Sequence, residues 1–409
     1  MLRRVEIKNF RSCKDVVIEI DGDFLVLVGK NGAGKTNLLR AIDWAAGCAC
    51  SSITLDQDDL RDDQPLEVKL QFDLDSKRYE YAVSVNIARF LISDEPTGLK
   101  MVVGEKLLNL DQSGNSSLVF SRVDEVVNIP GRPEPLKIGQ ESGVLPTVAK
   151  IFPADDVFVI TTRPVLHFLN VLRYYPLEDE PKLDAAEWYN SSDRMIHGDA
   201  YSKWLTQYQS SGDAGASVLL RLLHLAVSNA EEFIILKSML GEDGLALIDA
   251  IIYDPISFPR GDRTGKQNLS ETYHFLAFIP SNSSSRSDFG FRFGALSLGT
   301  RRIVRILVHM LFDHSSVMLI EQPEDGLHQG MTKKLIGMLK ANAAPTQLII
   351  SSHSSALLNT LKPEEVRLVT ISDGVTSVRS LSAREIEAAS NFMNKDGTLS
   401  DFFETVQEE

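Results

Sequence analysis

The residues with the clearest chemistry form a glycine-rich stretch near the amino terminus, GKNGAGKT, residues 29–36. It fits the pattern G-x-x-x-x-G-K-[ST], in which backbone N–H groups close around phosphates. The lysine of this pattern neutralises the β- and γ-phosphates of a nucleotide, and the final hydroxyl ligates Mg²⁺. Lys35 and Thr36 hold these two positions. The other residues expected to bind the nucleotide here are Gly29, Asn31, Gly32 and Gly34.

The segments on either side of this loop are those that phosphate binding requires. An apolar, β-rich run precedes it at residues 24–28, and residues 37–44 have apolar positions at helical spacing. Such a helix presents the positive end of its dipole to the phosphates. Strand, loop and helix in this order favour a nucleotide site over a glycine-rich turn that matches by accident. GTP is disfavoured, because the stretch NKDG, residues 394–397, places its Asp one position too early for the guanine motif N-K-x-D.

Composition and charge bound the class of protein. The chain has 409 residues, 43% of them hydrophobic and 24% charged, which is typical of a globular protein with more than one lobe. A net charge of -14 argues against a surface that binds nucleic acid throughout, although a local basic patch is compatible with it. Three cysteines are too few for a four-ligand zinc site. No signal peptide or run of roughly 18 apolar residues occurs, so we expect a soluble, cytoplasmic protein with no membrane partner.

Three stretches in the C-terminal third could complete a nucleotide site. In GALSLGTRRIV, residues 294–304, a small-residue turn opens a helix. In VMLIEQPEDGLH, residues 317–328, a buried strand ends in acidic residues, at the edge where a parallel α/β sheet faces its ligand. In LIISSHSS, residues 348–355, another apolar strand ends at His353, and a histidine there can sense a γ-phosphate.

Together with NFRS, residues 9–12, these stretches resemble the ABC-type ATPase heads of the RecF, SMC and OLD group. They are most similar to the short bacterial AAA-family ATPases of anti-phage defence, such as the PtuA-like subunits of Septu and retron systems. The resemblance covers residues 1 to about 75 and about 270 to 409. It implies an α/β fold, an ABC-type P-loop ATPase head with a mixed sheet, an antiparallel β lobe and an inserted helical lobe.

The resemblance also implies an ATP sandwich between two identical heads. Lys35 and Thr36 of one head would hold ATP and Mg²⁺. Ser297 and Gly299 of the other head would cap the γ-phosphate. A homodimer that forms only with ATP is therefore expected.

Four further residues take family positions near the metal and the phosphates. Glu321 takes the position of the Mg²⁺-coordinating acid, and His353 that of the switch histidine. Arg11 resembles a basic residue near the nucleotide, with an exposed loop arginine as the alternative. Gln71, in VKLQFDLD, is a candidate for the glutamine that links Mg²⁺ to the second lobe. Its alternative is a glutamine on the polar face of a strand.

Gln322 occupies the place where family heads carry the glutamate that acts as general base. A neutral amide can orient the attacking water but cannot accept its proton, and losing a general base commonly costs about 10² to 10⁴ in rate. ATP binding and dimer closure would survive. Three explanations stay open: the natural protein hydrolyses ATP slowly, Glu321 or Glu324 takes over as base, or a glutamate was changed to glutamine to trap ATP.

Between the two ATPase halves the residue pattern changes twice. Residues 77–103 alternate as short strands, and residues 162–252, including LALIDAII at their end, show helical spacing. The predicted organisation is an N-terminal ATPase lobe with an antiparallel extension (1–150), an inserted helical lobe (151–270) and a C-terminal ATPase lobe (271–409). No sustained heptads occur, so the long coiled-coil arms of SMC proteins are not expected.

The sequence shows no second active site. The acidic run LDQDDLRDD, residues 55–63, predicts a solvated loop rather than a metal site. After His353 we expect only a strand pair and a short helical tail. An ATPase without its own effector domain should gate a separate effector, such as a nuclease or toxin, in a defence complex. The alternatives are a non-hydrolysing, nucleotide-dependent scaffold and a RecF-like DNA-repair ATPase that binds nucleic acid.

Overall fold

The chain divides into two compact units. The computed structural model describes residues 1–51, 53–55, 57–59, 64–92, 95–111, 115–176, 195–211, 217–228, 230–259, 270–281, 290–395 and 397–407. The core unit comprises Met1–Tyr175, Ser315–Gln322 and Ala343–Glu409, and the inserted unit comprises Pro176–His314 and Pro323–Asn342. These limits differ from the predicted limits at 150 and 270, because strands from both ends of the chain pair within the core unit.

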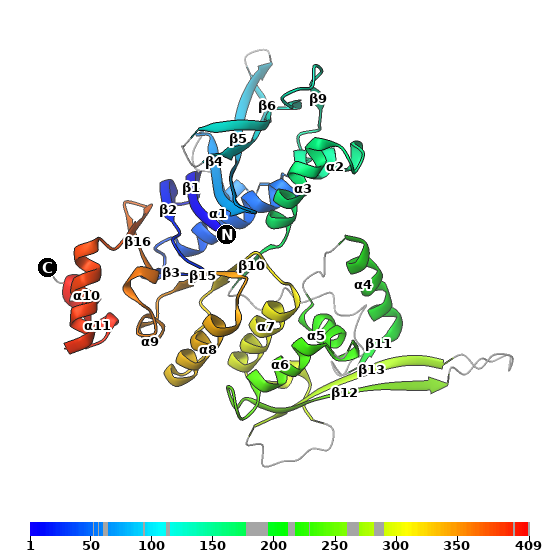
Figure 1. Cartoon of the computed structure of the whole chain (residues 1–409), viewed down its shortest axis with the longest axis vertical. Helices are drawn as coiled ribbons and strands as arrows, with labels where there is room; N and C mark the ends of the chain where they lie inside the picture. Colours follow the sequence, from blue (N-terminus) through cyan, green and yellow to red (C-terminus); the bar gives the residue numbers. More distant parts are fainter. Residues whose placement is uncertain are drawn as a thin grey trace. The chain divides into compact units, whose positions relative to one another are not determined.

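A six-stranded mixed sheet in the core unit carries the phosphate-binding loop (Figure 1). Its strands, in spatial order, are β10 (Leu172–Tyr175), β14 (Val317–Glu321), β15 (Gln347–Ser352), β3 (Phe24–Val28), β16 (Val366–Ser372) and β17 (Val375–Ser380). The first five run parallel, and β17 returns antiparallel to β16. β14 and β15 are buried along their whole length, as expected for parallel strands covered on both faces. The carboxyl ends of β3, β14 and β15 meet at one edge.

An eight-stranded antiparallel sheet forms the rest of the β structure in the core unit. Its spatial order is β2 (Cys13–Glu19), β1 (Leu2–Phe10), β4 (Leu66–Leu74), β5 (Lys77–Ile92), β6 (Glu95–Leu110), β7 (Ser116–Val123), β8 (Val126–Asn128) and β9 (Leu136–Lys137). Helices α1 (Lys35–Cys50), α2 (Val144–Ile151) and α3 (Val157–Asn170) pack on one another. The ring of Phe72 on β4 stacks on that of Phe168 on α3, with 4.6 Å between centroids. The predicted α/β class, with mixed and antiparallel sheets, is confirmed.

The C-terminal end of the core unit consists of short helical elements around the edge of the six-stranded sheet (Figure 1). These are α9 (Ser355–Leu358), the 3₁₀ turn Pro363–Glu365, α10 (Ala383–Lys395) and α11 (Leu399–Gln407). α11 packs against α9, and the backbone N–H of Ser400 donates to Oδ1 of Asn359 at 2.8 Å. The predicted strand pair and helical tail after His353 are both present.

The inserted unit combines helices with a small antiparallel sheet. The helices are α4 (Gly198–Ser211), α5 (Val218–Val227), α6 (Glu231–Leu240), α7 (Leu298–Phe312) and α8 (Gln329–Asn342). The sheet orders β11 (Met195–His197), β13 (Ser270–Pro280) and β12 (Ile248–Pro259). The helix predicted at the LALIDAII stretch was wrong: Ile251 and Ile252 lie on β12, opposite residues of β13, where β-branched side chains are favoured. No helix among the described residues is long and apolar enough to cross a membrane.

Candidate nucleotide site

The phosphate-binding loop connects β3 to α1 through a tight glycine turn. Gly32 and Gly34 have φ of 78° and 98°, in the left-handed region that favours glycine. A Cβ on Gly34 would overlap Oγ1 of Thr376, and one on Gly29 would overlap the carbonyl oxygen of Val369. Gly34 is the N-cap of α1, so the first N–H groups of that helix open toward the loop. This is the arrangement that binds phosphate at a helix N-terminus.

Lys35 holds its charge at the loop rather than in solvent. The side chain is 5% exposed, and Nζ donates to the carbonyl oxygens of Gly29 at 2.7 Å and Lys30 at 2.9 Å. The ammonium therefore bridges the first two residues of the loop. A phosphate seated in the loop would meet this positive charge directly.

Thr36 and Glu321 come together from opposite ends of the chain. The Thr36 hydroxyl donates to Oε1 of Glu321, and the Tyr174 hydroxyl donates to Oε2 at 3.0 Å. Glu321 is 6% exposed, at the carboxyl end of β14, and Tyr174 lies on the neighbouring strand β10. Burial raises the pKa of Tyr174 well above its ordinary value, so this hydroxyl stays protonated and remains a donor.

The Thr36 and Glu321 side chains fit Mg²⁺. Hydroxyl and carboxylate oxygens are hard ligands, and Mg²⁺ is usually held by one or two carboxylates together with the phosphates of a substrate. The part of the chain that the structure describes holds no cluster of three or more His, Cys, Asp or Glu side chains suited to a metal. A metal ion at Thr36 and Glu321 would take its further ligands from water and from the phosphates of a nucleotide.

Gln322 directly follows this carboxylate in an unusual backbone conformation. Its φ is 41°, and its N–H donates to the carbonyl oxygen of Ser351 at 2.9 Å, extending the pairing of β14 with β15. A non-glycine residue at positive φ costs about 1 to 3 kcal/mol and occurs often at functional sites. Glu321 accepts from two hydroxyl donors in the core unit, and Glu324 belongs to the inserted unit. The action of either residue as a substitute base stays a prediction.

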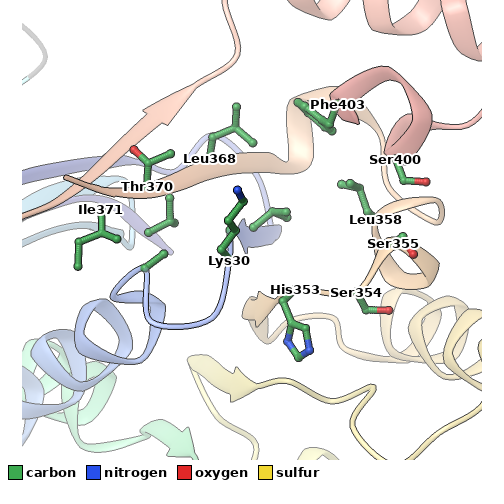
Figure 2. Close-up of a pocket in the computed structure, with 14 residues that line it drawn as sticks. Lys30, His353, Ser354, Ser355, Leu358, Leu368, Thr370, Ile371, Ser400 and Phe403 are labelled. Atoms are coloured by element: carbon green, nitrogen blue, oxygen red, sulfur yellow. The ribbon is translucent and has the colours of Figure 1, made fainter. Parts of the chain in front are cut away.

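His353 lies at the rim of a cavity of about 540 Å³ beside the phosphate-binding loop (Figure 2). The polar residues that line it include Lys30, His353 and Ser354, and the apolar ones include Leu358, Leu368 and Phe403. Neither Thr36 nor Glu321 lines the cavity. The cavity therefore borders the phosphate-binding loop and does not contain the predicted Mg²⁺ ligands.

Comparison with known families places ATPase sequence in both halves of the chain. The family described as "AAA ATPase domain" matches residues 1–128. The family described as "AAA domain, putative AbiEii toxin, Type IV TA system" matches residues 259–359.

Curated relatives match shorter stretches. The OLD nuclease of Thermus scotoductus is 38% identical over 78 residues, which is 18% of this chain and 15% of that protein. The RecF DNA replication and repair protein of Acholeplasma laidlawii is 28% identical over 93 residues, 23% of this chain and 26% of that protein. The Rad50 double-strand break repair ATPase of Archaeoglobus fulgidus is 48% identical over 42 residues, 10% and 5% of the two chains. The chain carries an AAA-family ATPase domain of the RecF, Rad50 and OLD type.

The stretches that align with this chain make up at most 26% of the length of any of these three relatives. Among solved structures, the SMC head domain of Thermotoga maritima aligns with a TM-score of 0.39 at 14% identity, over 93% of this chain and 99% of that one. The Smc head of Pyrococcus furiosus bound to the C-terminal domain of ScpA aligns with a TM-score of 0.43 at 12% identity, over 96% and 99%.

Ser297 and Gly299, which were predicted to contact the γ-phosphate bound by a second head, lie in the inserted unit. Ser297 is the N-cap of α7, and its Oγ accepts from the N–H of Thr300 at 3.1 Å. A Cβ on Gly299 would lie 2.7 Å from the carbonyl oxygen of Gly326, so the turn requires glycine. The turn and helix predicted from sequence are present. Their action on the nucleotide of a second head stays a prediction.

Arg11 is engaged by the acidic run that was expected to be a solvated loop. It has φ of 48° in the turn between β1 and β2, and its guanidinium lies 2.6 Å from Oδ1 of Asp59. Asp59 is 7% exposed, in the 3₁₀ turn Gln57–Asp59, while positions 56 and 60–63 of the run lie outside the described residues. The run therefore holds Arg11 in an ion pair. A contact of Arg11 with a nucleotide stays a prediction.

Gln71 lies at the end of the strands remote from the phosphate-binding loop. Its neighbour Phe72 pairs with Leu2, and the N–H of Leu2 donates to Oε1 of Gln347, the first residue of β15, at 2.8 Å. The loop follows the opposite end of the adjacent strand β3, and six residues of strand span about 20 Å. The Gln71 amide donates to Glu80 at 2.7 Å. The structure does not bring Gln71 to the Mg²⁺ site and instead places it on the polar face of a strand.

Sequence reasoning missed Tyr174, Ser12 and Thr376, all of which touch the site. Tyr174 was hidden because only the pairing of β10 with β14 brings it to Glu321. Ser12 belongs to the NFRS stretch, in which only Arg11 was predicted to lie near the nucleotide. Thr376 carries no local signal, since its contact with Ala33 joins residues 343 positions apart.

Proposed function

We propose that the chain binds ATP with Mg²⁺ in an ABC-type head, that two identical chains close on the nucleotide, and that closure gates a separate effector, a nuclease or toxin, in bacterial anti-phage defence. The observation that carries the proposal is the contact of the Thr36 hydroxyl with the Glu321 carboxylate, beside a lysine held at the phosphate-binding loop. Three residues with the chemistry of a nucleotide–Mg²⁺ site are thereby gathered from two distant parts of the sequence.

Each of these residues has a distinct part in the proposed mechanism. Lys35 would pair with the β- and γ-phosphates, and Thr36 and Glu321 would hold Mg²⁺, which would supply positive charge to neutralise the phosphate oxygens. Tyr174 keeps the carboxylate of Glu321 oriented. Gln322 orients the attacking water but leaves its proton in place, so turnover is slow.

The dimer and effector parts of the proposal rest on resemblance. ABC-type heads close through a turn like that of Ser297 and Gly299, which here opens a helix of 15 residues. The match of residues 259–359 to a family whose description names a toxin and a Type IV TA system favours a role beside an effector.

The test is phosphate release by the unchanged chain and by Gln322→Glu. We expect ATP binding by both and faster release by the variant, by about 10² or more, because a carboxylate restores the general base. Gln329→Glu, at an exposed position at the start of α8 in the inserted unit, makes the same chemical change and should leave the rate unchanged. ATP binding without hydrolysis by either chain would refute the enzyme and support a nucleotide-dependent scaffold. No ATP binding at all would refute both.

A DNA-repair role is the second candidate, because the RecF protein of Acholeplasma laidlawii is among the relatives. It predicts ATP-dependent binding of DNA by the isolated chain, with an affinity that falls as salt is raised. Equal binding with and without ATP across a salt titration would exclude it.

A further inference from the structure

Hydroxyl groups from two distant segments meet at the last turn of the phosphate-binding loop. Oγ1 of Thr376, on β17, lies 3.0 Å from the carbonyl oxygen of Ala33 and 2.7 Å from Oγ of Ser12. Ser12 belongs to the turn between β1 and β2. Nδ2 of Asn37, on α1, lies 2.8 Å from the same Ser12 oxygen. We refer to Ala33, Asn37, Ser12 and Thr376 as the hydroxyl clasp.

The donors and acceptors of the clasp have one consistent order. A carbonyl only accepts and an amide nitrogen only donates, so Thr376 gives its proton to Ala33 and Asn37 donates to Ser12. Thr376 has then no proton left for Ser12, which must be the donor between the two hydroxyls. The hydrogen bonds run in one direction from Asn37 to Ala33. Bonds aligned in this way reinforce one another.

The clasp fixes the peptide unit between Ala33 and Gly34. In a trans peptide the C=O and N–H groups point in opposite directions. Holding the Ala33 carbonyl against Thr376 therefore turns the Gly34 N–H away from β17. Thr376 is 1% exposed, so water does not compete for this contact. The backbone N–H of Thr376 also donates to the carbonyl oxygen of Ser12 at 2.9 Å, which fixes the two hydroxyl-bearing segments to each other.

We propose that Thr376 and Ser12 are positioning residues that hold the Gly34 N–H ready to bind a nucleotide phosphate. The inference rests on the proposed ATP-binding function and adds that ATP affinity depends on Thr376 and Ser12. Phosphate affinity depends on the strand pair β16–β17, although this pair lies far along the sequence and contributes no residue of the GKNGAGKT motif.

The test is the affinity of the full chain for ATP with Mg²⁺, measured by calorimetric titration. Thr376→Val replaces the hydroxyl with a methyl group of similar shape and should weaken ATP binding about tenfold, since the carbonyl of Ala33 loses its partner. Thr376→Ser keeps the hydroxyl and should restore the affinity. Ser12→Ala should also weaken binding. Combining it with Thr376→Val should cost little more than Thr376→Val alone, because both changes break the same chain.

A matched control exists on the same strand pair. Oγ of Ser377 lies 2.8 Å from Oγ1 of Thr370 in an exposed hydroxyl pair, so Ser377→Ala removes a comparable hydrogen bond and should leave ATP affinity unchanged. Thermal unfolding of each variant separates loss of fold from loss of affinity, and Ser12→Ala serves if Thr376→Val does not fold.

The outcomes separate this inference from the function on which it rests. Undiminished ATP binding by both Thr376→Val and Ser12→Ala would overturn the positioning role and leave the proposed function intact. A weakening that Thr376→Ser fails to restore, or that Ser377→Ala reproduces, would also overturn it. Failure of the unchanged chain to bind ATP would overturn both together.

Discussion

The carboxylate of Glu321 shows how single side chains set the state of the site. One oxygen accepts from Thr36 and the other from Tyr174. If Mg²⁺ binds between Thr36 and Glu321, it would replace the hydrogen bond between these two side chains. The hydrogen bond from Tyr174 to the other carboxylate oxygen can persist. Tyr174 is therefore a partner that orients a metal ligand, and such partners commonly contribute about 10- to 100-fold to metal affinity.

Tyr174→Phe tests this role. We expect the Mg²⁺ concentration for half-maximal ATP binding to rise about 10-fold or more, because Glu321 loses the donor that orients it. ATP titrations at a series of Mg²⁺ concentrations measure the change. Tyr273→Phe is the control, since the Tyr273 hydroxyl also faces a glutamate, Glu271 at 3.4 Å, but in the inserted unit. An unchanged Mg²⁺ requirement in Tyr174→Phe would rule the role out.

At the scale of elements, α1 joins the phosphate-binding loop to the edge strand β10 through polar contacts. Arg40 interacts with Tyr174, and Asp43, one turn later on the helix, interacts with Arg173. Burial raises the pKa of Asp43 to about 6, and Arg173 offsets only part of that rise. The helix that carries Lys35 and Thr36 thus holds a partly buried acid that is costly to ionise.

Asp43→Asn should stabilise the chain at neutral pH. The pKa of Asp43 is higher in the folded state than in the unfolded state, so its ionisation removes stability as pH rises from about 4 through about 6. Urea unfolding should show the variant about 2 kcal/mol more stable at pH 7 and equal to the unchanged chain near pH 4. Asp15→Asn, at an exposed position on β2, is the control. A stability difference independent of pH would contradict the assignment.

The site residues whose places in the fold could be predicted from sequence are those fixed by one element or by the shared edge of parallel strands. The residues from Gly29 to Thr36 form the loop because a strand, a glycine turn and a helix follow directly along the chain. Glu321 and His353 could be placed at one sheet edge because parallel strands share their carboxyl ends. Gln71 could not be placed, since its position depends on which end of β4 faces the loop, and pairing between strands alone decides that.

At the scale of the whole molecule, the proposed sandwich requires two heads for each nucleotide. Sedimentation should show ATP-dependent dimers of the unchanged chain. Ser297→Arg should bind ATP but weaken the dimer by about 30-fold or more, the size of a 2 kcal/mol interface hot spot. Ser238→Arg, at an exposed position on α6 of the same unit, should dimerise normally.

A mixture of two defective chains tests whether the sites form between heads. Lys35→Ala keeps the Ser297 turn, and Ser297→Arg keeps the phosphate-binding loop. Mixed dimers should therefore regain one intact site and hold one ATP. Dimerisation of Ser297→Arg alone, as strong as that of the unchanged chain, would count against the sandwich.

The strands that pair with β3 in the six-stranded sheet determine when the phosphate-binding loop can fold during translation. β3 ends near residue 28, yet it pairs with β15 and β16, which begin at Gln347 and Val366. During synthesis the GKNGAGKT segment leaves the ribosome long before either partner strand exists, and such distant pairings form slowly. The phosphate-binding loop is thus translated well before the strands that complete its surroundings. A nascent chain should acquire ATP affinity only after β15 and β16 have been translated.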